Sequence, residues 1–461
     1  MHLCRLRCTL PSGTMAQTRA TACALAAASA AGKTRKRLSA TRLPTGFLSA
    51  GPRGTTPAVH LDMASNAFQK ALSQEALRRA WRDIYGKASR DSRNTVGIDG
   101  VSINDFEPHH RTNIAHLSRE LQAGVFKFSS LKPTLIPKTT SGKYRLISVP
   151  TVRDRIVQRA LVAFLSRKYH QTLANDISYG FVNGRSVKQA ADRACAMRTT
   201  HPWVFKTDIT SFFDMIDREV LCAAIRKQIR EKSLHNILCS AVACEVDDTD
   251  PKKAMKIAKL GIQRGRGIRQ GMPVSPLFSN FLLIPFDRRI EASGACAIRY
   301  ADDLIFFAKS HNECLKIAEF CKAEFEKLNL NIPPIEPGSK SVIYAPGQAA
   351  EFLGLELSPL GGLYELRLST TQIARIREEL LQFGSIKELL SRKITLTSLG
   401  PILTAKRSGY LAAYDVCTNI SEVALHLSDV EQRALRKVYR DGLGIDLKTI
   451  SNEARAFLGL R

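Results

Sequence analysis

Residues 298–308 read Ile298-Arg299-Tyr300-Ala301-Asp302-Asp303-Leu304-Ile305-Phe306-Phe307-Ala308, and two adjacent acids stand in the middle of this stretch. The runs on either side are rich in β-forming residues, which predicts a tight hairpin with the acids at its bend. Carboxylates side by side repel each other unless a cation lies between them. The stretch therefore predicts a β-hairpin that holds a metal ion.

A solvated loop is the alternative, because acidic pairs are common in loops. The chain holds a second pair, Asp247-Asp248, with no strand-like run after it. Asp302 and Asp303 differ from that pair because apolar residues follow at once, so their backbone enters a core. A short motif alone carries a high false-positive risk. The metal-site interpretation therefore requires a further carboxylate nearby.

A third acid, Asp208, ends the short apolar stretch 203–208, and a pattern suited to one helix follows from Phe212 to Leu221. An acid at the end of a core strand can meet acids on a neighbouring hairpin. Three carboxylates from two strands can hold two divalent ions about 4 Å apart, which suits in-line phosphoryl transfer. Oxygen ligands favour Mg²⁺, and Mn²⁺ is a suitable substitute.

These residues resemble a known family, the reverse transcriptases, most closely those of the bacterial group II intron type and the related defence-associated, retron-like enzymes. Tyr300-Ala301-Asp302-Asp303 is similar to their signature, Asp208 with Phe213 is similar to their first catalytic strand, and further blocks match between residues 97 and 357. The resemblance implies an α+β, right-hand polymerase fold with fingers, a ferredoxin-like palm and a helical thumb. It implies that Asp208, Asp302 and Asp303 are catalytic and, with Ile209, bind the metal ions.

The resemblance also implies a set of nucleotide-binding residues: Lys143, Arg145, Phe213, Gln270, Gly271 and Lys340. Lys143 and Arg145 alternate with apolar neighbours on a predicted strand, and spacing alone leaves a solvated strand face as the alternative. In the family, the position of Phe213 carries a side chain that excludes a ribose hydroxyl. We therefore expect dNTPs as substrates.

Two groups of arginines are candidates for nucleic-acid binding. Arg153, Arg155 and Arg159 lie on a predicted helix that Thr151 caps, away from its apolar stripe. Arg264, Arg266 and Arg269 belong to a basic run just before Gln270. The alternative for each group is a solvated face.

The formal net charge of the chain is +26, which implies a polyanionic partner. We expect an RNA template and the nascent DNA. Anionic membrane is the competing partner, but no stretch of 18 apolar residues exists to span a bilayer. The 11 cysteines lack the spacing of a zinc ribbon or a disulfide framework, so a reduced cytoplasm is the expected location.

The patterns divide the chain into four parts: 1–62, a basic tail; 63–175, the fingers; 176–357, the palm with the catalytic carboxylates; and 358–461, a helical thumb. Residues 1–61 contain nine basic and no acidic residues, which fits a disordered tail or an overcalled start before Met63 better than an organellar targeting peptide. Residues 63–175 hold 19 basic and 8 acidic residues, so the fingers are expected to face phosphates.

The expected function is RNA-directed DNA synthesis, in antiviral defence with a cognate noncoding RNA. No His-Asn-His or zinc-ligand cluster follows residue 358, so an intron-type endonuclease domain is not expected. Neither Asn-Ala-x-x-His nor Val-Thr-Gly, which retron enzymes usually carry, occurs. The alternatives are a group II intron-type reverse transcriptase or maturase without endonuclease, and a catalytically silent RNA-binding scaffold.

Overall fold

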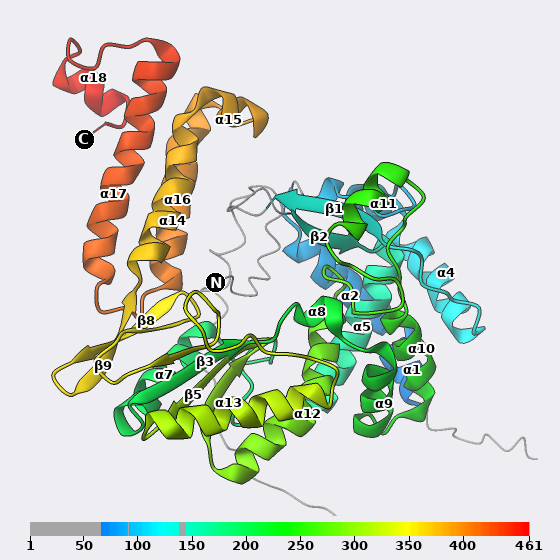
Figure 1. The fold of residues 1–461 in the computed structure, drawn as a ribbon. Helices are drawn as coiled ribbons and strands as arrows, with labels where there is room; N and C mark the ends of the chain where they lie inside the picture. Colours follow the sequence, from blue (N-terminus) through cyan, green and yellow to red (C-terminus); the bar gives the residue numbers. More distant parts are fainter. Residues whose placement is uncertain (1–65, 91, 138–143, 461) are drawn as a thin grey trace, which may run out of the picture.

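The computed structural model describes residues 66–90, 92–137 and 144–460, and Figure 1 shows an α+β molecule built around one sheet. This central sheet has the strand order β4-β5-β3-β6, and each neighbouring pair is antiparallel. Its strands are β3 (Trp203–Asp208), β4 (Cys296–Tyr300), β5 (Asp303–Ala308) and β6 (Val342–Tyr344).

Both faces of the central sheet are buried. Leu304 and Phe306 on β5 pack into the apolar cluster that contains α12 (Ser275–Ser293) and α13 (His311–Glu326). Ile305 and Phe307 point to the other face, toward α7 (Val187–Thr200). Successive side chains of a strand point to opposite faces, so a strand buried on both sides reads as an unbroken apolar run. The predicted hairpin of 298–308 is confirmed as β4 and β5.

A helical lobe with its own hairpin precedes the sheet. The hairpin joins β1 (Lys132–Pro137) and β2 (Tyr144–Val149). The helices are α1 (Ala67–Ala71), α2 (Gln74–Lys87), α3 (Ile103–Phe106), α4 (His110–Gln122), α5 (Val152–Lys168) and α6 (His170–Leu173). As predicted, Thr151 caps α5, since its hydroxyl accepts a 3.2 Å hydrogen bond from Asp154 N.

The single helix predicted after Asp208 is wrong, because the chain forms two. α8 (Phe212–Met215) ends at Ile216, whose backbone is extended, and the Asp217 side chain then caps α9 (Arg218–Gln228). The helices α10 (Lys232–Val242) and α11 (Pro251–Ala258) follow. An aspartate inside a helical pattern favours a new N-terminus because its carboxylate can accept from the first free amides.

The C-terminal part is helical only from residue 370 onward, so the predicted wholly helical thumb from 358 is wrong at its start. A second sheet, β7-β8-β9, comes first and consists of β7 (Ala350–Phe352), β8 (Leu355–Leu360) and β9 (Leu363–Leu368). The helices are α14 (Thr370–Leu381), α15 (Ile386–Ser391), α16 (Leu396–Ala413), α17 (Ile420–Lys437) and α18 (Asn452–Phe457). One apolar cluster runs from α7 through this sheet into α14 and α17.

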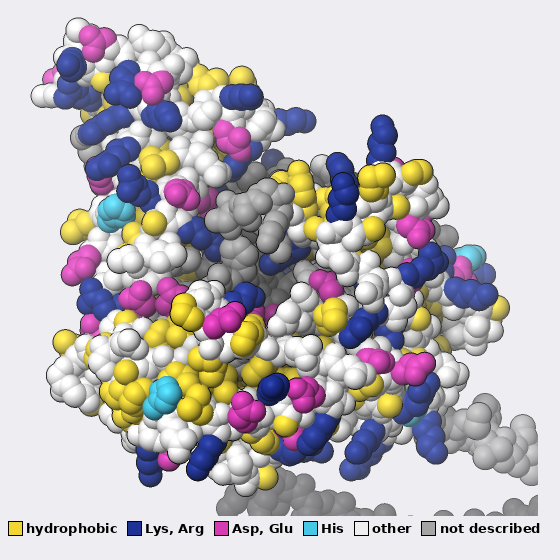
Figure 2. All heavy atoms as spheres, viewed as in Figure 1, with side chains coloured by type: hydrophobic (Ala, Val, Ile, Leu, Met, Phe, Trp, Pro, Cys, Tyr) yellow, Lys and Arg dark blue, Asp and Glu magenta, His cyan; other side chains and the backbone are white. Residues whose placement is uncertain are grey.

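Lys and Arg side chains gather over the lobe formed by α14–α18, as Figure 2 shows. Short 3₁₀ or π turns complete the described backbone at Ser92–Asn94, Glu107–His109, Gln382–Gly384 and Val438–Gly442. Within the described ranges, every helix is too short or too polar to cross a membrane. The predicted basic tail, 1–62, lies outside the described residues.

Candidate active site

The three predicted catalytic aspartates lie together at one end of the central sheet. Asp208 and Asp303 are register partners on the antiparallel strands β3 and β5, and such partners have Cα atoms about 4.5–5.5 Å apart. Asp302 occupies the turn between β4 and β5, and its carbonyl accepts a 3.2 Å hydrogen bond from Ile209 N. Acids far apart in the sequence are therefore neighbours in space.

The acids are held in a poorly solvated position. Burial, and then the charge of Asp302, raise the pKa of Asp303 to about 7, while Lys206 acts in the opposite direction. Lys206 itself is 5% exposed. Burial lowers its pKa, although Asp303 and nearby Glu351 oppose that shift. The site thus concentrates negative charge that a cation would stabilise.

Lys340 provides one internal counterion. Its ammonium forms an ion pair with Oδ2 of Asp208. The adjacent Ser341 fixes this approach, because a 2.7 Å hydrogen bond joins its hydroxyl to that of Thr207 on β3. Lys340 was predicted to bind nucleotide, and the structure places its side chain, half exposed, against the predicted metal ligands.

The residues at this end of the sheet suit a divalent cation. Oδ1 of Asp208 is buried and has no hydrogen-bond partner, and carboxylate oxygens are the ligands that Mg²⁺ and Mn²⁺ favour. Nevertheless, within the described ranges no three His, Cys, Asp or Glu side chains are already arranged as metal ligands. The Lys340–Asp208 ion pair occupies the other carboxylate oxygen of Asp208.

The side chains of Ile209 and Phe213, which follow Asp208 in the sequence, are buried, at 1% and 5% exposure. Ile209 can therefore offer a metal only its backbone. The ring of Phe213 packs edge-on against that of Phe212, with centroids 5.4 Å apart, and its carbonyl accepts from Ile268 N at 2.8 Å. This bond ties α8 to the loop that leads to Gln270.

Gln270 and Gly271 lie against the second strand of the fingers hairpin. Ser148 N donates to the Gln270 carbonyl at 2.7 Å. Gly271 has a φ of +107°, and a Cβ there would lie 2.4 Å from Ser148 O. The close approach and the left-handed backbone both require glycine. Arg145 pairs with Ile136 across the same hairpin, whereas Lys143 lies outside the described residues.

The three arginines of α5 have protein partners. Arg153 and Arg159 form ion pairs with Glu120 and Asp83. Arg155 donates to the Pro150 carbonyl through Nε at 2.9 Å. Their contacts hold α5 in the fingers and do not support the predicted role in binding template.

In the second group, the predicted phosphate contact by Arg269 is wrong because its side chain is 3% exposed. Arg269 instead pairs with Glu245 at 2.7 Å, as does Arg218. Arg266 donates to the Met215 carbonyl at 3.2 Å. Arg264 alone of this group is largely exposed, in an ion pair with Asp248.

Sequence reasoning missed Glu245, which organises the loop before Gln270. Its carboxylate accepts hydrogen bonds from Arg218, Arg269 and Gly265 N, each at 2.7 Å. Its backbone carbonyl accepts from Leu131 N at 2.8 Å, next to β1. Lys206 was missed as well, although a lysine two positions before Asp208 on an apolar strand shares its face.

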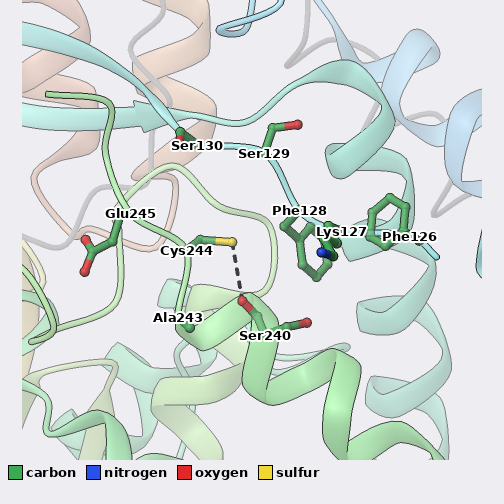
Figure 3. Close-up of a pocket in the computed structure, with 9 residues that line it drawn as sticks. All are labelled: Phe126, Lys127, Phe128, Ser129, Ser130, Ser240, Ala243, Cys244 and Glu245. Atoms are coloured by element: carbon green, nitrogen blue, oxygen red, sulfur yellow. Dashed lines mark hydrogen bonds between the residues drawn. The ribbon is translucent and has the colours of Figure 1, made fainter. Parts of the chain in front are cut away.

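A separate hollow of about 330 Å³ lies between the loop at 126–130 and the end of α10 (Figure 3). Its lining consists of Phe126, Lys127, Phe128, Ser129, Ser130, Ser240, Ala243, Cys244 and Glu245. The Cys244 thiol donates to the Ser240 carbonyl at 3.6 Å. None of the three aspartates lines it, so it is not part of the acidic site.

A four-stranded antiparallel sheet carries facing aspartates on its two central strands, a helical lobe with a hairpin before it and a second helical lobe after it. This is the fold of the right-hand polymerases, with palm, fingers and thumb. Within that class, residues 136–357 match the family model described as "Reverse transcriptase (RNA-dependent DNA polymerase)". Residues 136–357, a little under half of the chain, therefore form a reverse transcriptase domain.

Individual relatives are distant. Protein YkfC of Escherichia coli K12 is 29% identical over 43% of this chain and 50% of its own length. The retron Ec83 reverse transcriptase of E. coli is 28% identical over 37% of this chain and 50% of its own length. The group II intron-encoded protein LtrA of Lactococcus lactis is 24% identical over 57% of this chain and 41% of its own length. The chain thus spans about half the length of these relatives. Apo telomerase from Candida tropicalis is similar with a TM-score of 0.38, at 15% identity, over 72% of this chain and 61% of that chain.

Proposed function

We propose that this protein is an RNA-directed DNA polymerase that extends a primer with dNTPs. The observation that carries the proposal is the pairing of Asp208 with Asp303, beside Asp302, within the segment that matches the reverse transcriptase family. In the reaction, the primer 3′ oxygen forms a bond to the α-phosphorus, and the bond to pyrophosphate breaks.

Asp208, Asp302 and Asp303, with the backbone of Ile209, would hold the metal ions of this reaction. Enzymes of the family use divalent metals, and we propose two Mg²⁺ ions, which would activate the primer hydroxyl and stabilise the leaving oxygens. Asp208 keeps a buried carboxylate oxygen without a partner, which favours its role as a ligand.

The remaining roles concern the incoming nucleotide. We propose that Lys340 moves from Asp208 to the triphosphate when metal binds, and that Arg145 and Lys143 contact the same phosphates from the fingers. Arg offers phosphate a two-pronged donor and Lys a point charge. Phe213 would crowd the sugar at C2′, and Gln270 and Gly271 would line the base-pair pocket beside Ser148.

The test is dNTP incorporation on a primed RNA template with Mg²⁺. The full chain should incorporate dNTPs, and D208A and D302A should not, while both stay folded by circular dichroism. D248A is the matched control, since Asp248 belongs to the other acidic pair and forms only an exposed ion pair. Synthesis by folded D302A would contradict the catalytic assignment, and inactivity of the intact chain would favour an RNA-binding scaffold.

The biological template is a further proposal. Relatives include both a retron reverse transcriptase and a group II intron-encoded protein, so we propose a structured noncoding RNA as the partner, in antiviral defence. Sequencing of the RNA and DNA that copurify with the protein tests this. One enriched RNA with complementary DNA would support it, and product made without any template would contradict it.

A further inference from the structure

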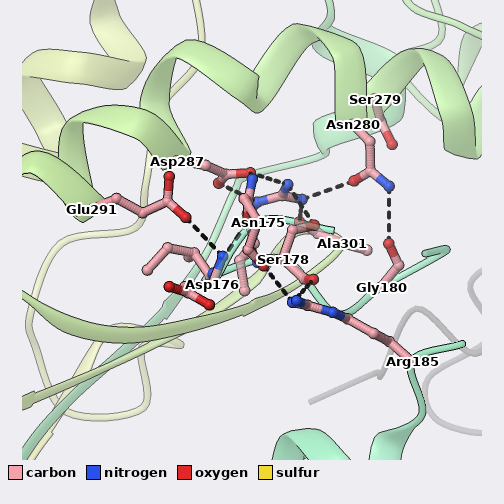
Figure 4. A network of polar contacts seen from close by, with 12 residues as sticks. Asn175, Asp176, Ser178, Gly180, Arg185, Ser279, Asn280, Asp287, Glu291 and Ala301 are labelled. Atoms are coloured by element: carbon pink, nitrogen blue, oxygen red, sulfur yellow. Dashed lines mark hydrogen bonds and ion pairs between the residues drawn. The ribbon is translucent and has the colours of Figure 1, made fainter. Parts of the chain in front are cut away.

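Arg299, which precedes the Tyr-Ala-Asp-Asp turn on β4, is 1% exposed, and all five of its N–H groups donate hydrogen bonds. Figure 4 shows the groups that accept them, on Ser178, Asn280, Asp287 and Ala301. Nε and Nη2 donate to the two carboxylate oxygens of Asp287 at 2.7 and 2.6 Å. Nη2 also donates to Ser178 Oγ at 2.8 Å. Nη1 donates to Asn280 Oδ1 at 3.0 Å and to the Ala301 carbonyl at 3.1 Å.

The groups that receive these bonds are themselves fixed. Asp287 is fully buried in α12 and also accepts from Asn175 Nδ2 at 2.9 Å. Asn280, on the same helix, donates to the Gly180 carbonyl at 2.9 Å. Arg299 therefore joins α12 and the segment 175–180 to the end of β4. A guanidinium satisfied by rigid partners has little freedom to move.

The turn itself needs this support. Ala301 has a φ of +62°, a left-handed conformation that is unfavourable for alanine. Gly180 packs so closely against this turn that a Cβ on it would lie 2.3 Å from Ala301 N. The strained residue is thus held between Gly180 and the guanidinium, immediately before Asp302.

We propose that Arg299 is a positioning residue that holds the turn so that the carboxylates of Asp302 and Asp303 are presented to metal beside Asp208. The proposal rests on the proposed polymerase function for its catalytic consequence, but not for its effect on metal binding. A buried ion pair gives little net stability compared with apolar packing. The contacts of Arg299 with the turn, rather than a contribution of its ion pair to stability, therefore account best for an arginine at this position.

The test compares R299K with R198K. Lysine retains the positive charge opposite Asp287. Its single ammonium group cannot donate to all the groups that accept hydrogen bonds from the guanidinium. Arg198 is a matched control, since it is fully buried and donates to the carbonyls of Leu357 and Gln348, each at 2.6 Å. It lies near the start of β3, at the end opposite Asp208.

Three readouts are measured on the full chain: Mn²⁺ affinity without substrate by electron paramagnetic resonance, amide hydrogen exchange over residues 299–304, and steady-state kinetics. R299K should weaken Mn²⁺ binding by about 10- to 100-fold and speed exchange in the turn. It should lower kcat by a similar factor, with KM for dNTP nearly unchanged. R198K should lower thermal stability comparably and leave Mn²⁺ affinity and exchange in the turn as in the wild type.

Wild-type Mn²⁺ affinity in R299K, or an equal loss in R198K, would overturn the proposal. If R299K does not fold, S178A withdraws a single acceptor from the guanidinium and should weaken Mn²⁺ binding about threefold. No change in S178A would then overturn it. Because Mn²⁺ affinity and hydrogen exchange do not require synthesis, these outcomes remain decisive if the polymerase proposal itself fails.

Discussion

Asp208 and Asp303 face each other as register partners on β3 and β5, with Asp302 in the turn next to them. Lys340 pairs with Asp208, and buried Lys206 lies two positions before it on the same face. The acidic end of the sheet is therefore balanced by ammonium groups of the protein itself. Four predictions follow from this arrangement and from the loops around it.

Replacement of Asp303 by Asn should abolish synthesis, by at least about 10³-fold, without loss of stability. The buried carboxylate faces another acid, so its removal relieves repulsion and desolvation. The melting temperature in EDTA at pH 8 should be at least that of the wild type. D248N should keep both activity and stability. A marked loss of stability in D303N would contradict the repulsion argument.

Replacement of Lys340 by Ala should have opposite effects on metal and on nucleotide. Without nucleotide, Mn²⁺ should bind about fivefold tighter, since a half-exposed ion pair that competes for Asp208 is worth up to about 1 kcal/mol. The KM for dNTP should rise about tenfold through loss of a charged phosphate contact. Calorimetric Mn²⁺ titration and steady-state kinetics measure the two effects. Weaker Mn²⁺ binding would show that Lys340 does not compete with metal.

Replacement of Phe213 by Val should reduce the preference for dNTPs over rNTPs by about tenfold or more, because a smaller side chain leaves space for a 2′ hydroxyl. F212V is the matched control, since Phe212 is the neighbouring buried ring and the substitution removes the same volume. Both variants should lose comparable stability through the cavity they create. Competition between dCTP and rCTP on one template gives the ratio, and equal changes in both variants would refute the assignment.

Replacement of Glu245 by Gln should destabilise the protein at neutral pH and raise the KM for dNTP. Burial alone would raise the pKa of Glu245, but hydrogen bonds from Arg218 and Arg269 lower it below its usual value. Because the pKa of Glu245 is lower in the folded protein than in the unfolded chain, its carboxylate stabilises the fold fully at a pH above the unfolded pKa of about 4.3. That stabilisation is lost as the pH falls from there through the folded pKa. The difference in melting temperature should therefore shrink below pH 4.3.

The control for this prediction is E75Q, because Glu75 forms only exposed ion pairs with Arg79 and Arg82. It should melt like the wild type at every pH. A pH-independent difference for E245Q would indicate that Glu245 acts through packing and not through its charge.

The strands and the acidic turn could be predicted because local patterns determine them. An unbroken run of apolar residues after an acidic pair predicts a strand that is buried on both faces, as β5 is. Thr151 predicts the start of a helix because its hydroxyl can accept a hydrogen bond from the first turn. Lys340 could be placed near the acids only through the family resemblance.

The partners of buried charges could not be predicted, because they come from distant parts of the chain. Arg269 belongs to a basic run that suggests phosphate contact, yet Glu245, 24 positions earlier, holds it inside the protein. Arg299 meets Ser178, 121 positions away. Sequence patterns report which residues are charged, whereas the fold determines whether a carboxylate or solvent lies opposite.

The apolar cluster beneath β5 continues without interruption through β8 into the helices α14 and α17. The predicted boundary between palm and thumb, residue 357, lies inside β8. It therefore does not coincide with a break in the hydrophobic packing. A polypeptide ended there would leave half of a shared interior exposed to water. The palm and the thumb should consequently unfold together, in a single cooperative thermal transition.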